Sequence, residues 1–255
     1  MQWCFFAFSR STHRARAFTA QVVFKPPKAI RGGIPLCFPQ FSDFGPLGQH
    51  GFARNQEWEI VTDRTSSEAV TMRLASTEAT LESWPHRFEC TYKVSLEGDE
   101  LVTDLTVANH NQGAEPMTFT TALHTYFKVA DASKARVEGL KGTKYLDSLK
   151  KREKFDETGD AVTFAEEVDR IYLATPDALQ IVDPTGGKTV TLAKTGLPDA
   201  VVWNPWVDKS RATGDLGDED YKEMVCVEAA AIDTPVVVHA GETWTCRQKL
   251  SVSRS

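Results

Sequence analysis

Residues 87–109, RFECTYKVSLEGDELVTDLTVAN, alternate apolar and polar side chains on both sides of a short turn that contains a glycine. A period of two places one set of side chains on a buried face and the other set in solvent, which is typical of two paired antiparallel strands. Gly98 can adopt the positive φ that such a tight turn requires. The stretch therefore predicts a β-hairpin.

The same alternation recurs at short intervals along most of the chain. Turn sequences at 183–188 and 239–243 predict two further hairpins, and only 148–155 and 218–224 suggest short helical turns. No internal repeat or linker divides the sequence. We therefore expect an all-β fold, a large antiparallel sandwich or barrel, in a single domain that spans residues 21–255.

Composition narrows the classes of function. The chain has 255 residues, of which 41% are hydrophobic, and a formal net charge of −6. That charge argues against nucleic acid or an anionic membrane as a partner, because both need a summed basic field. No apolar run reaches the roughly eighteen residues of a membrane span. An anionic ligand must therefore be bound by a local cluster of basic side chains.

The five cysteines are widely spaced and include no C-x-x-C pair. An odd number at such spacing indicates neither a disulfide framework nor a zinc site. This usage fits a reducing compartment. We therefore expect a cytoplasmic protein without a metal.

The amino terminus differs from the rest of the chain. No acidic residue occurs from Met1 to Ser42, and SRSTHRARAFTA (9–20) is rich in arginine and serine. Such a segment is either a transit peptide for a plastid or mitochondrion or a leader that precedes the domain proper. We favour a leader over residues 1–20.

Two glycine-rich segments carry candidate basic residues. IRGGIPLCFPQF (30–41) places Arg31 in apolar surroundings, and GPLGQHGFARNQEWEI (45–60) carries Gln49, His50 and Arg54. A guanidinium in apolar surroundings needs an anionic partner, either an internal carboxylate or a bound oxyanion. Gln49 can hold a sugar hydroxyl or brace its loop, and His50 has the same two alternatives.

Two titratable residues lie in predicted strands. The alternation of TTALHTYFKVA (120–130) puts His124 on one face with Tyr126, and that of EMVCVEAAAI (223–232) puts Glu228 inside an apolar strand. Burial raises the pKa of a carboxylate, so Glu228 is either paired with an arginine or placed for proton transfer. His124 is either structural or catalytic.

Two further residues are candidates for a sugar site. Asp169 in EEVDRIYLA (166–174) can accept a hydrogen bond from a ligand hydroxyl or cap its own turn. Trp203 in WNPW (203–206) can form a stacking platform for a sugar or belong to the core.

Five segments, in this order, carry a family resemblance. They are FKPPKAIRGGIPLCFPQF (24–41), GQHGFARNQEW (48–58), LHTYF (123–127), VDRIYL (168–173) and WNPWVDKSRATGDLGDEDYKEMVCVEAA (203–230). The chain resembles the hexose-6-phosphate mutarotases, the glucose-6-phosphate 1-epimerase branch of the aldose 1-epimerase superfamily, and especially its plant members. The resemblance runs from about Val22 to Val252.

The resemblance implies a galactose-mutarotase-like β-supersandwich with His124 and Glu228 as the catalytic pair. It also implies a set of substrate-binding residues in which the arginines contact phosphate: Arg31, Gln49, Arg54 and Asp169. We add His50 and Trp203 to the substrate-binding candidates. The implied reaction exchanges α and β anomers of a hexose 6-phosphate.

The chemistry needs one base and one acid. Glu228 takes the proton from O1 while His124 protonates the ring oxygen O5, and the roles reverse when the ring recloses, so that no metal or other cofactor is required. For this role His124 must be protonated, which a neighbouring carboxylate favours.

One feature departs from the family pattern. Its members carry several strands before the RGGIP loop, whereas the first thirty residues here suggest at most one, near AQVVFK (20–25). We therefore expect a sandwich that lacks N-terminal strands.

Two alternative functions stay open: an aldose 1-epimerase for free sugars, and a non-catalytic sugar-phosphate-binding protein on the same fold. We expect a monomer whose partner is a small-molecule hexose 6-phosphate.

Overall fold

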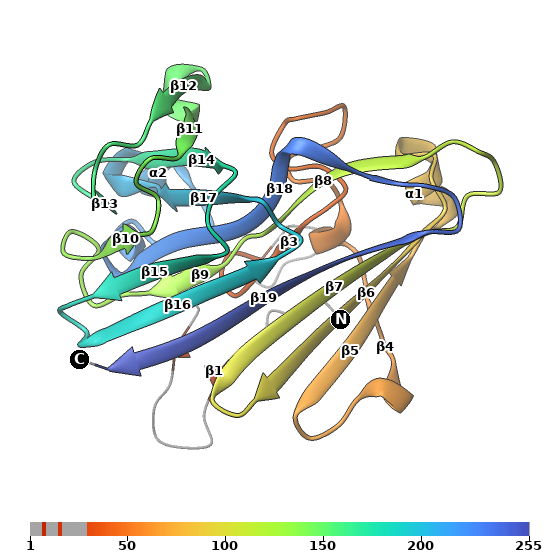
Figure 1. The fold of residues 1–255 in the computed structure, drawn as a ribbon, viewed down its shortest axis with the longest axis horizontal. Helices are drawn as coiled ribbons and strands as arrows, with labels where there is room; N and C mark the ends of the chain where they lie inside the picture. Colours follow the sequence, from red (N-terminus) through yellow and green to blue (C-terminus); the bar gives the residue numbers. More distant parts are fainter. Residues whose placement is uncertain (1–6, 9–14, 17–29, 255) are drawn as a thin grey trace.

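The computed structural model describes residues 7–8, 15–16 and 30–254 (Figure 1). Strands dominate this part of the chain, and its α-helices are short: α1 (Glu78–Ser83) and α2 (Trp206–Ala212). Four 3-10 turns complete the non-strand elements: η1 (Ala53–Asn55), η2 (Thr62–Arg64), η3 (Ser148–Lys150) and η4 (Asp220–Glu223). No helix in the described ranges has the length and hydropathy needed to cross a bilayer.

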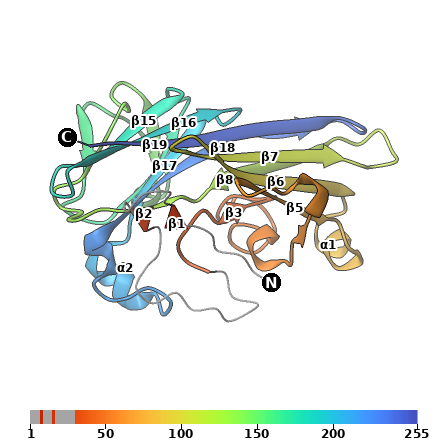
Figure 2. The same ribbon diagram turned by 90° about the horizontal axis from the view of Figure 1, so that it is seen from below.

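Two antiparallel sheets stack as layers (Figure 2). The nine-stranded sheet has the order β13 (Ala161–Thr163), β10 (Arg136–Glu138), β15 (Ala178–Asp183), β16 (Lys188–Thr195), β19 (Thr243–Arg254), β7 (Glu100–Asn109), β6 (Phe88–Glu97), β5 (Ala69–Ala75) and β4 (Glu59–Ile60). The eight-stranded sheet has the order β12 (Glu153–Asp156), β11 (Lys144–Asp147), β14 (Val168–Leu173), β17 (Asp199–Asn204), β18 (Met224–Val238), β8 (Met117–Leu123) and β3 (Leu36–Cys37), with β9 (Tyr126–Lys128) also paired to β18.

Two of the three predicted hairpins are confirmed. Strands β6 and β7 pair from Phe88↔Asn109 to Glu97↔Glu100, and Gly98 in their turn has a φ of 65°. Strands β15 and β16 pair up to Asp183↔Lys188. In both cases a glycine-containing turn is flanked by alternating strands, which is sufficient to set the register.

The third predicted hairpin, at 239–243, is wrong in one respect. Gly241 does form a turn with a φ of 79°, but the two strands it joins lie in different sheets. Strand β18 pairs with β8 and β17, whereas β19 pairs with β7 and β16. A turn sequence specifies a reversal of the chain but not whether the strands remain partners, and here the turn crosses the sandwich.

The helical predictions are partly confirmed. The turn η4 lies inside 218–224, and η3 occupies only the beginning of 148–155, where the chain continues into β12. The pattern of the sequence did not reveal α1 or α2. Both helices have six or seven residues, too few for an apolar stripe with a period of 3.6 to be recognised.

The core lies between the two sheets. The nine-stranded sheet contributes side chains such as Phe88 and Leu105, and the eight-stranded sheet contributes alternate residues such as Leu123 and Val227. Because side chains alternate along a strand, the intervening residues of the eight-stranded sheet face the opposite way. On that outer side lie α2 and part of segment 30–58 (Figure 2). The same segment also contributes β3 to the sheet and places Phe38 and Ala53 in the core.

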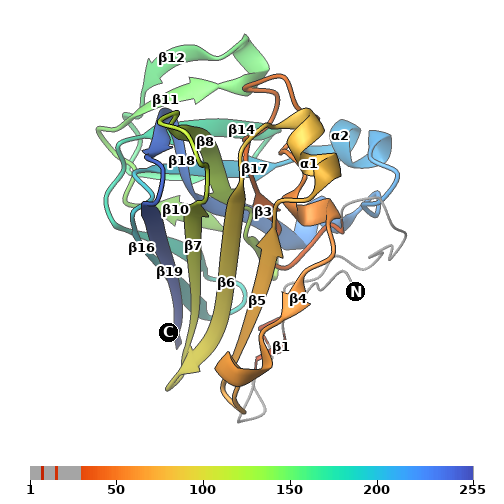
Figure 3. The same ribbon diagram turned by 90° about the vertical axis from the view of Figure 1, so that its right-hand side faces the viewer.

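Residues before the RGGIP loop are described only in part. Ala7–Phe8 (β1) and Ala15–Arg16 (β2) pair as a separate antiparallel sheet. The other residues of the predicted leader 1–20, and the expected strand at 20–25, lie outside the described residues. Strand β4 forms one edge of the nine-stranded sheet (Figure 3). The expectation of at most one strand in the first thirty residues is therefore wrong, because β1 and β2 both lie there. The incompleteness of the sandwich and the domain boundary at residue 21 stay predictions.

Candidate active site

His124 lies at a break between two strands. Strand β8 ends at Leu123 and β9 begins at Tyr126. The RGGIP loop takes the position of a neighbouring strand here: the His124 N–H donates to the Pro35 carbonyl oxygen (2.9 Å) and the Tyr126 N–H to that of Gly33 (3.0 Å). The loop therefore holds the backbone on both sides of the histidine.

Glu228 lies beside His124 on the adjacent strand. In the register of β18 with β8, Ala229 pairs with Leu123, so the preceding and following residues are neighbours. Nε2 of His124 is 3.4 Å from Oε1 of Glu228, and both side chains are buried. The fold thus brings together the two residues that the resemblance implied as a catalytic pair. Among the described residues, the Glu228 carboxyl group contacts His124 and forms no ion pair with an arginine.

Each member of the pair also has a polar atom that the protein leaves unsatisfied. Nδ1 of His124 and Oε2 of Glu228 are buried and make no hydrogen bond within the described residues. A buried polar atom without a partner costs free energy, and in native proteins such atoms often mark catalytic groups or sites that a ligand or water completes. This arrangement supports a functional role for the pair.

Burial moves the pKa of both groups toward their neutral forms. It raises the pKa of Glu228 well above the ordinary value of a carboxyl group. The pKa of His124 is lowered well below its ordinary value by burial and by the neighbouring His50, Arg54 and Arg31. The expected mechanism requires a protonated His124, whereas both pKa shifts favour the neutral imidazole and the neutral carboxylic acid in the free protein.

Aromatic rings surround the imidazole of His124. Tyr126 stacks on it, with ring centroids 4.8 Å apart and an interplanar angle of 8°. Trp203 and His50 meet it edge to face at 5.9 and 5.6 Å. Trp203 is itself buried and packs with Tyr126, Met224 and Cys226. It is therefore part of the wall that holds His124, and its proposed contact with a sugar stays a prediction.

Each of the two arginines, Arg31 and Arg54, already has a partner within the protein. Nε of Arg31 forms an ion pair with Oδ1 of Asp215 at 2.6 Å, so the internal carboxylate is the partner observed here. The Arg31 side chain is nevertheless 33% exposed, so a ligand can reach part of the guanidinium, which also interacts with Tyr126. Nη2 of Arg54 donates to the carbonyl oxygen of Gln49 (3.0 Å), whose own side chain is exposed. Both arginines lie close enough to lower the pKa of His124.

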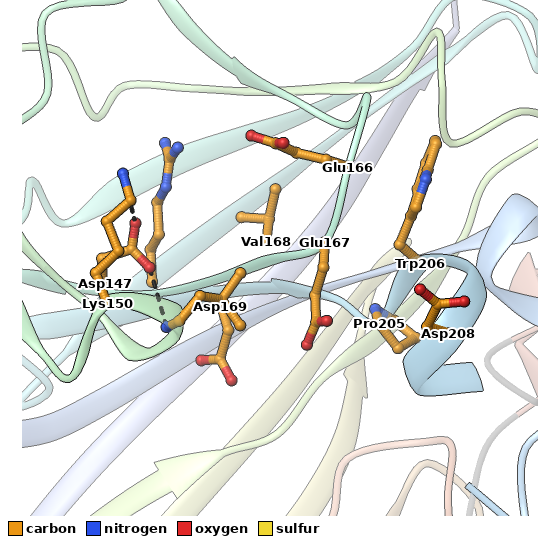
Figure 4. Close-up of a pocket in the computed structure, with 11 residues that line it drawn as sticks. Asp147, Lys150, Glu166, Glu167, Val168, Asp169, Pro205, Trp206 and Asp208 are labelled. Atoms are coloured by element: carbon orange, nitrogen blue, oxygen red, sulfur yellow. Dashed lines mark hydrogen bonds and ion pairs between the residues drawn. The ribbon is translucent and has the colours of Figure 1, made fainter. Parts of the chain in front are cut away.

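Asp169 lies on the same face of the sheet, because it pairs with Trp203. It also borders a cavity of about 370 Å³ in which carboxylates predominate (Figure 4). The cavity is lined by Asp147, Leu149, Lys150, Glu166, Glu167, Val168, Asp169, Arg170, Pro205, Trp206 and Asp208. Burial raises the pKa of Asp169 above its ordinary value. An acidic cavity of this kind disfavours a phosphate group.

Sequence reasoning missed several residues of this region. Cys37 and Asp215 contact candidate residues across loops, and the sequence offers no local signal for such pairs. The side chain of Gln40 bonds with Ser42 and Leu47 and so braces the loop before His50. Only Tyr126 could have been found, because the alternation of its strand already placed it on the face of His124.

The sequence matches the family described as aldose 1-epimerase over residues 6–251. This chain belongs to the aldose 1-epimerase family. A candidate glucose-6-phosphate 1-epimerase from the plant Cenchrus ciliaris is 47% identical to it over 242 residues, which cover 91% of this chain and 73% of that protein. Another from Salmonella typhimurium is 33% identical over 83% of this aldose 1-epimerase family member and 71% of the bacterial protein.

Solved structures agree with the fold of this family member. A candidate mutarotase from Salmonella typhimurium superposes with a TM-score of 0.84 and 29% identity, covering 95% of this chain and 81% of that one. The predicted all-β, mutarotase-like sandwich is therefore confirmed. The roles of the individual site residues stay predictions.

Proposed function

We propose that this protein is an isomerase that interconverts the α and β anomers of glucose 6-phosphate and related hexose 6-phosphates. The observation that carries the proposal is the buried contact of 3.4 Å between His124 and Glu228, with two arginines nearby. The proteins named as candidate glucose-6-phosphate 1-epimerases support the choice of substrate.

Anomer exchange moves one proton off O1 and one onto O5. When C1–O5 breaks, the open-chain aldehyde turns about C1–C2, and closure on the other face returns both protons. A pair that shares one proton can carry out this cycle, since one group accepts while the other donates. Each general acid or base typically contributes about 10²–10⁴-fold. We assign Glu228 as the base at O1 and His124 as the acid at O5.

Because the pKa shifts of His124 and Glu228 favour their neutral forms, we assign the phosphate group a second role. The positive charges of Arg31 and Arg54 help to keep His124 unprotonated. A phosphate dianion bound at these arginines would cancel much of that charge, because opposite charges in close contact compensate each other. The shared proton can then pass from Glu228 to His124, which produces the carboxylate base and imidazolium acid that ring opening needs.

A direct assay tests the proposal. The purified chain is mixed with freshly dissolved α-glucose 6-phosphate, and formation of the β-anomer is followed through a dehydrogenase specific for that anomer. We expect a rate well above that of buffer alone, and a much smaller acceleration with unphosphorylated glucose. If the rate equals that of buffer, the proposal is wrong. If glucose and its 6-phosphate react equally well, the protein is an epimerase of free sugars.

The ion pair between Arg31 and Asp215 favours this free-sugar alternative, because it gives Arg31 a purpose without phosphate. A non-catalytic binding protein is the remaining alternative. It predicts no turnover by the unmodified chain together with hexose 6-phosphate binding that survives in Glu228→Gln, which calorimetry measures directly.

We also propose that the protein acts as a monomer. His124, Glu228 and both arginines come from one chain, so a single copy can hold the whole constellation. Light scattering across a dilution series, with the specific activity measured at each concentration, tests this: the specific activity of a monomeric enzyme does not change on dilution.

A further inference from the structure

His50 occupies a constrained position in the loop beside the candidate pair. Its φ is 66°, a left-handed value that is uncommon for a residue with a side chain. Its N–H donates to the Ser42 carbonyl oxygen (2.9 Å), and its own carbonyl oxygen accepts from the Phe38 N–H (3.2 Å). Unfavourable backbone conformations persist where the surrounding structure enforces them, often at functional sites. The backbone thus fixes where the imidazole points.

Two groups contact the same ring nitrogen of His50. Nδ1 lies 3.2 Å from the backbone N of Ser42 and 3.1 Å from Sγ of Cys37. A backbone N–H can only donate, so Nδ1 must offer its lone pair, and the neutral ring then carries its proton on Nε2. It follows that the Cys37 thiol also acts as a donor to Nδ1. Burial raises the pKa of this thiol well above its ordinary value, which keeps the S–H proton in place.

The other ring nitrogen of His50, Nε2, is available to a ligand. Burial, together with Arg54 and Arg31, lowers the pKa of His50 to about 3, so the ring stays neutral under physiological conditions. Within the described part of the chain, Nε2 of His50 makes no hydrogen bond. The ring meets that of His124 edge to face, with centroids 5.6 Å apart and an interplanar angle of 69°. Its N–H is thus a donor next to the catalytic pair.

We propose that Cys37 is a positioning residue: its thiol, with the Ser42 N–H, holds His50 in the tautomer that carries the proton on Nε2, so that His50 donates a hydrogen bond to a sugar oxygen at the catalytic pair. The inference rests on the proposed function for its ligand, but the tautomer is a property of the free protein. The thiol acts through His50 and does not itself touch the substrate.

The test combines a spectroscopic and a kinetic measurement on the full chain. Proton–nitrogen correlation spectra of protein labelled with ¹⁵N-histidine report which ring nitrogen of His50 is protonated, and His50→Gln assigns the signals. Three variants are compared with the unmodified chain: Cys37→Ala removes the donor, Cys37→Ser restores a donor, and Cys90→Ala removes a thiol that is equally buried but lies in the opposite sheet. Thermal denaturation shows whether each variant is folded.

We expect the unmodified chain and Cys37→Ser to show His50 protonated on Nε2. In Cys37→Ala the population of the other tautomer should rise roughly two- to tenfold, which is what loss of one ordinary hydrogen bond allows, and kcat/KM for hexose 6-phosphate should fall by a similar factor. Cys90→Ala should change neither the tautomer nor kcat/KM.

Four outcomes would overturn the inference. The first is a proton on Nδ1 of His50 in the unmodified protein, which requires His50→Gln for the assignment but none of the cysteine variants. The others are unchanged His50 signals in Cys37→Ala, an equal shift in Cys90→Ala, and an unchanged kcat/KM in a Cys37→Ala variant whose tautomer has shifted. If the spectra behave as expected but the unmodified chain turns over no hexose 6-phosphate, the tautomer lock stands and the proposed function fails.

Discussion

The two faces of the eight-stranded sheet are both buried, but one packs in the core and the other carries the candidate site. Along β18, Val227 and Ala229 pack into the core between the sheets, whereas Cys226 and Glu228 face the candidate site. Val227 is 0% exposed and Glu228 is 2% exposed. Burial of the apolar face stabilises the fold. On the other face, burial of His124 and Glu228 leaves polar atoms unsatisfied and shifts their pKa values. Adjacent residues of β18 therefore serve stability and chemistry separately.

The largest expected effect on activity is found by substituting one residue on each face of β18 in separate variants. Glu228→Gln should lower kcat by about 10²–10⁴-fold, because it removes the proton acceptor and keeps the shape of the side chain. Val227→Ala should leave kcat nearly unchanged but cost about 1–3 kcal/mol of unfolding free energy, through lost burial and the cavity left behind. Anomer exchange rates and denaturant unfolding of both variants measure the difference.

The stability of the Glu228→Gln variant is a control for its loss of activity, because the two properties should change in opposite directions. Above the ordinary pKa of a carboxyl group, the unfolded chain releases the proton of Glu228 more readily than the folded chain does, so this residue destabilises the fold as pH rises. Glu228→Gln should therefore unfold at a higher temperature than the unmodified protein at pH 8. A variant that loses both activity and stability would show that Glu228 is mainly structural.

Much of this division could be predicted from the sequence. The alternation in EMVCVEAAAI already separated Val227 from Glu228, and that in LHTYF placed His124 and Tyr126 on one face. Side chains alternate along a strand, so whether a residue number is odd or even is enough to assign its side chain to one face of the sheet. The structure adds which strands are neighbours, and this brings His124 within 3.4 Å of Glu228.

Contacts that depend on loops could not be predicted. Arg31 and Asp215 are 184 positions apart, and neither lies in a strand, so no periodicity relates them. The crossing of the chain between sheets after Val238 is likewise invisible in a turn sequence. The protonation of the pair could not be inferred either, since it depends on the summed burial and charge around His124 rather than on its nearest neighbour.

A second, smaller effect is expected at the arginines. Arg54→Ala should raise KM for glucose 6-phosphate by about 10–100-fold, the range expected when charge-assisted hydrogen bonds are lost. It should change KM for glucose by less than about threefold. Arg31→Ala provides a matched comparison, because its guanidinium already has Asp215 as a partner and its loss should act partly through the loop. Equal losses for both sugars would show that the arginines only support the fold.

The third prediction concerns pH. The folded pKa of His50 is about 3, whereas the unfolded imidazole has its ordinary value near 6.5, so the unfolded state binds more protons between these limits. Stability should therefore fall as pH is lowered through this window. His50→Gln should reduce the slope by about 1.4 kcal/mol per pH unit between pH 6 and pH 4. Val227→Ala, on the core face, should displace the whole curve without changing its slope.

The smallest effect is expected in the acidic cavity. Glu166 lines it and is exposed to solvent, so its charge acts on a phosphate only through screened, longer-range repulsion. Glu166→Gln should lower KM for glucose 6-phosphate by less than about twofold, and the difference should vanish near 1 M salt, where the Debye length is about 3 Å. A severalfold rise in KM would instead mean that this cavity holds part of the substrate. In that case the functional face of the sheet extends past Asp169, and the phosphate has to be positioned by the arginines against the field of these carboxylates.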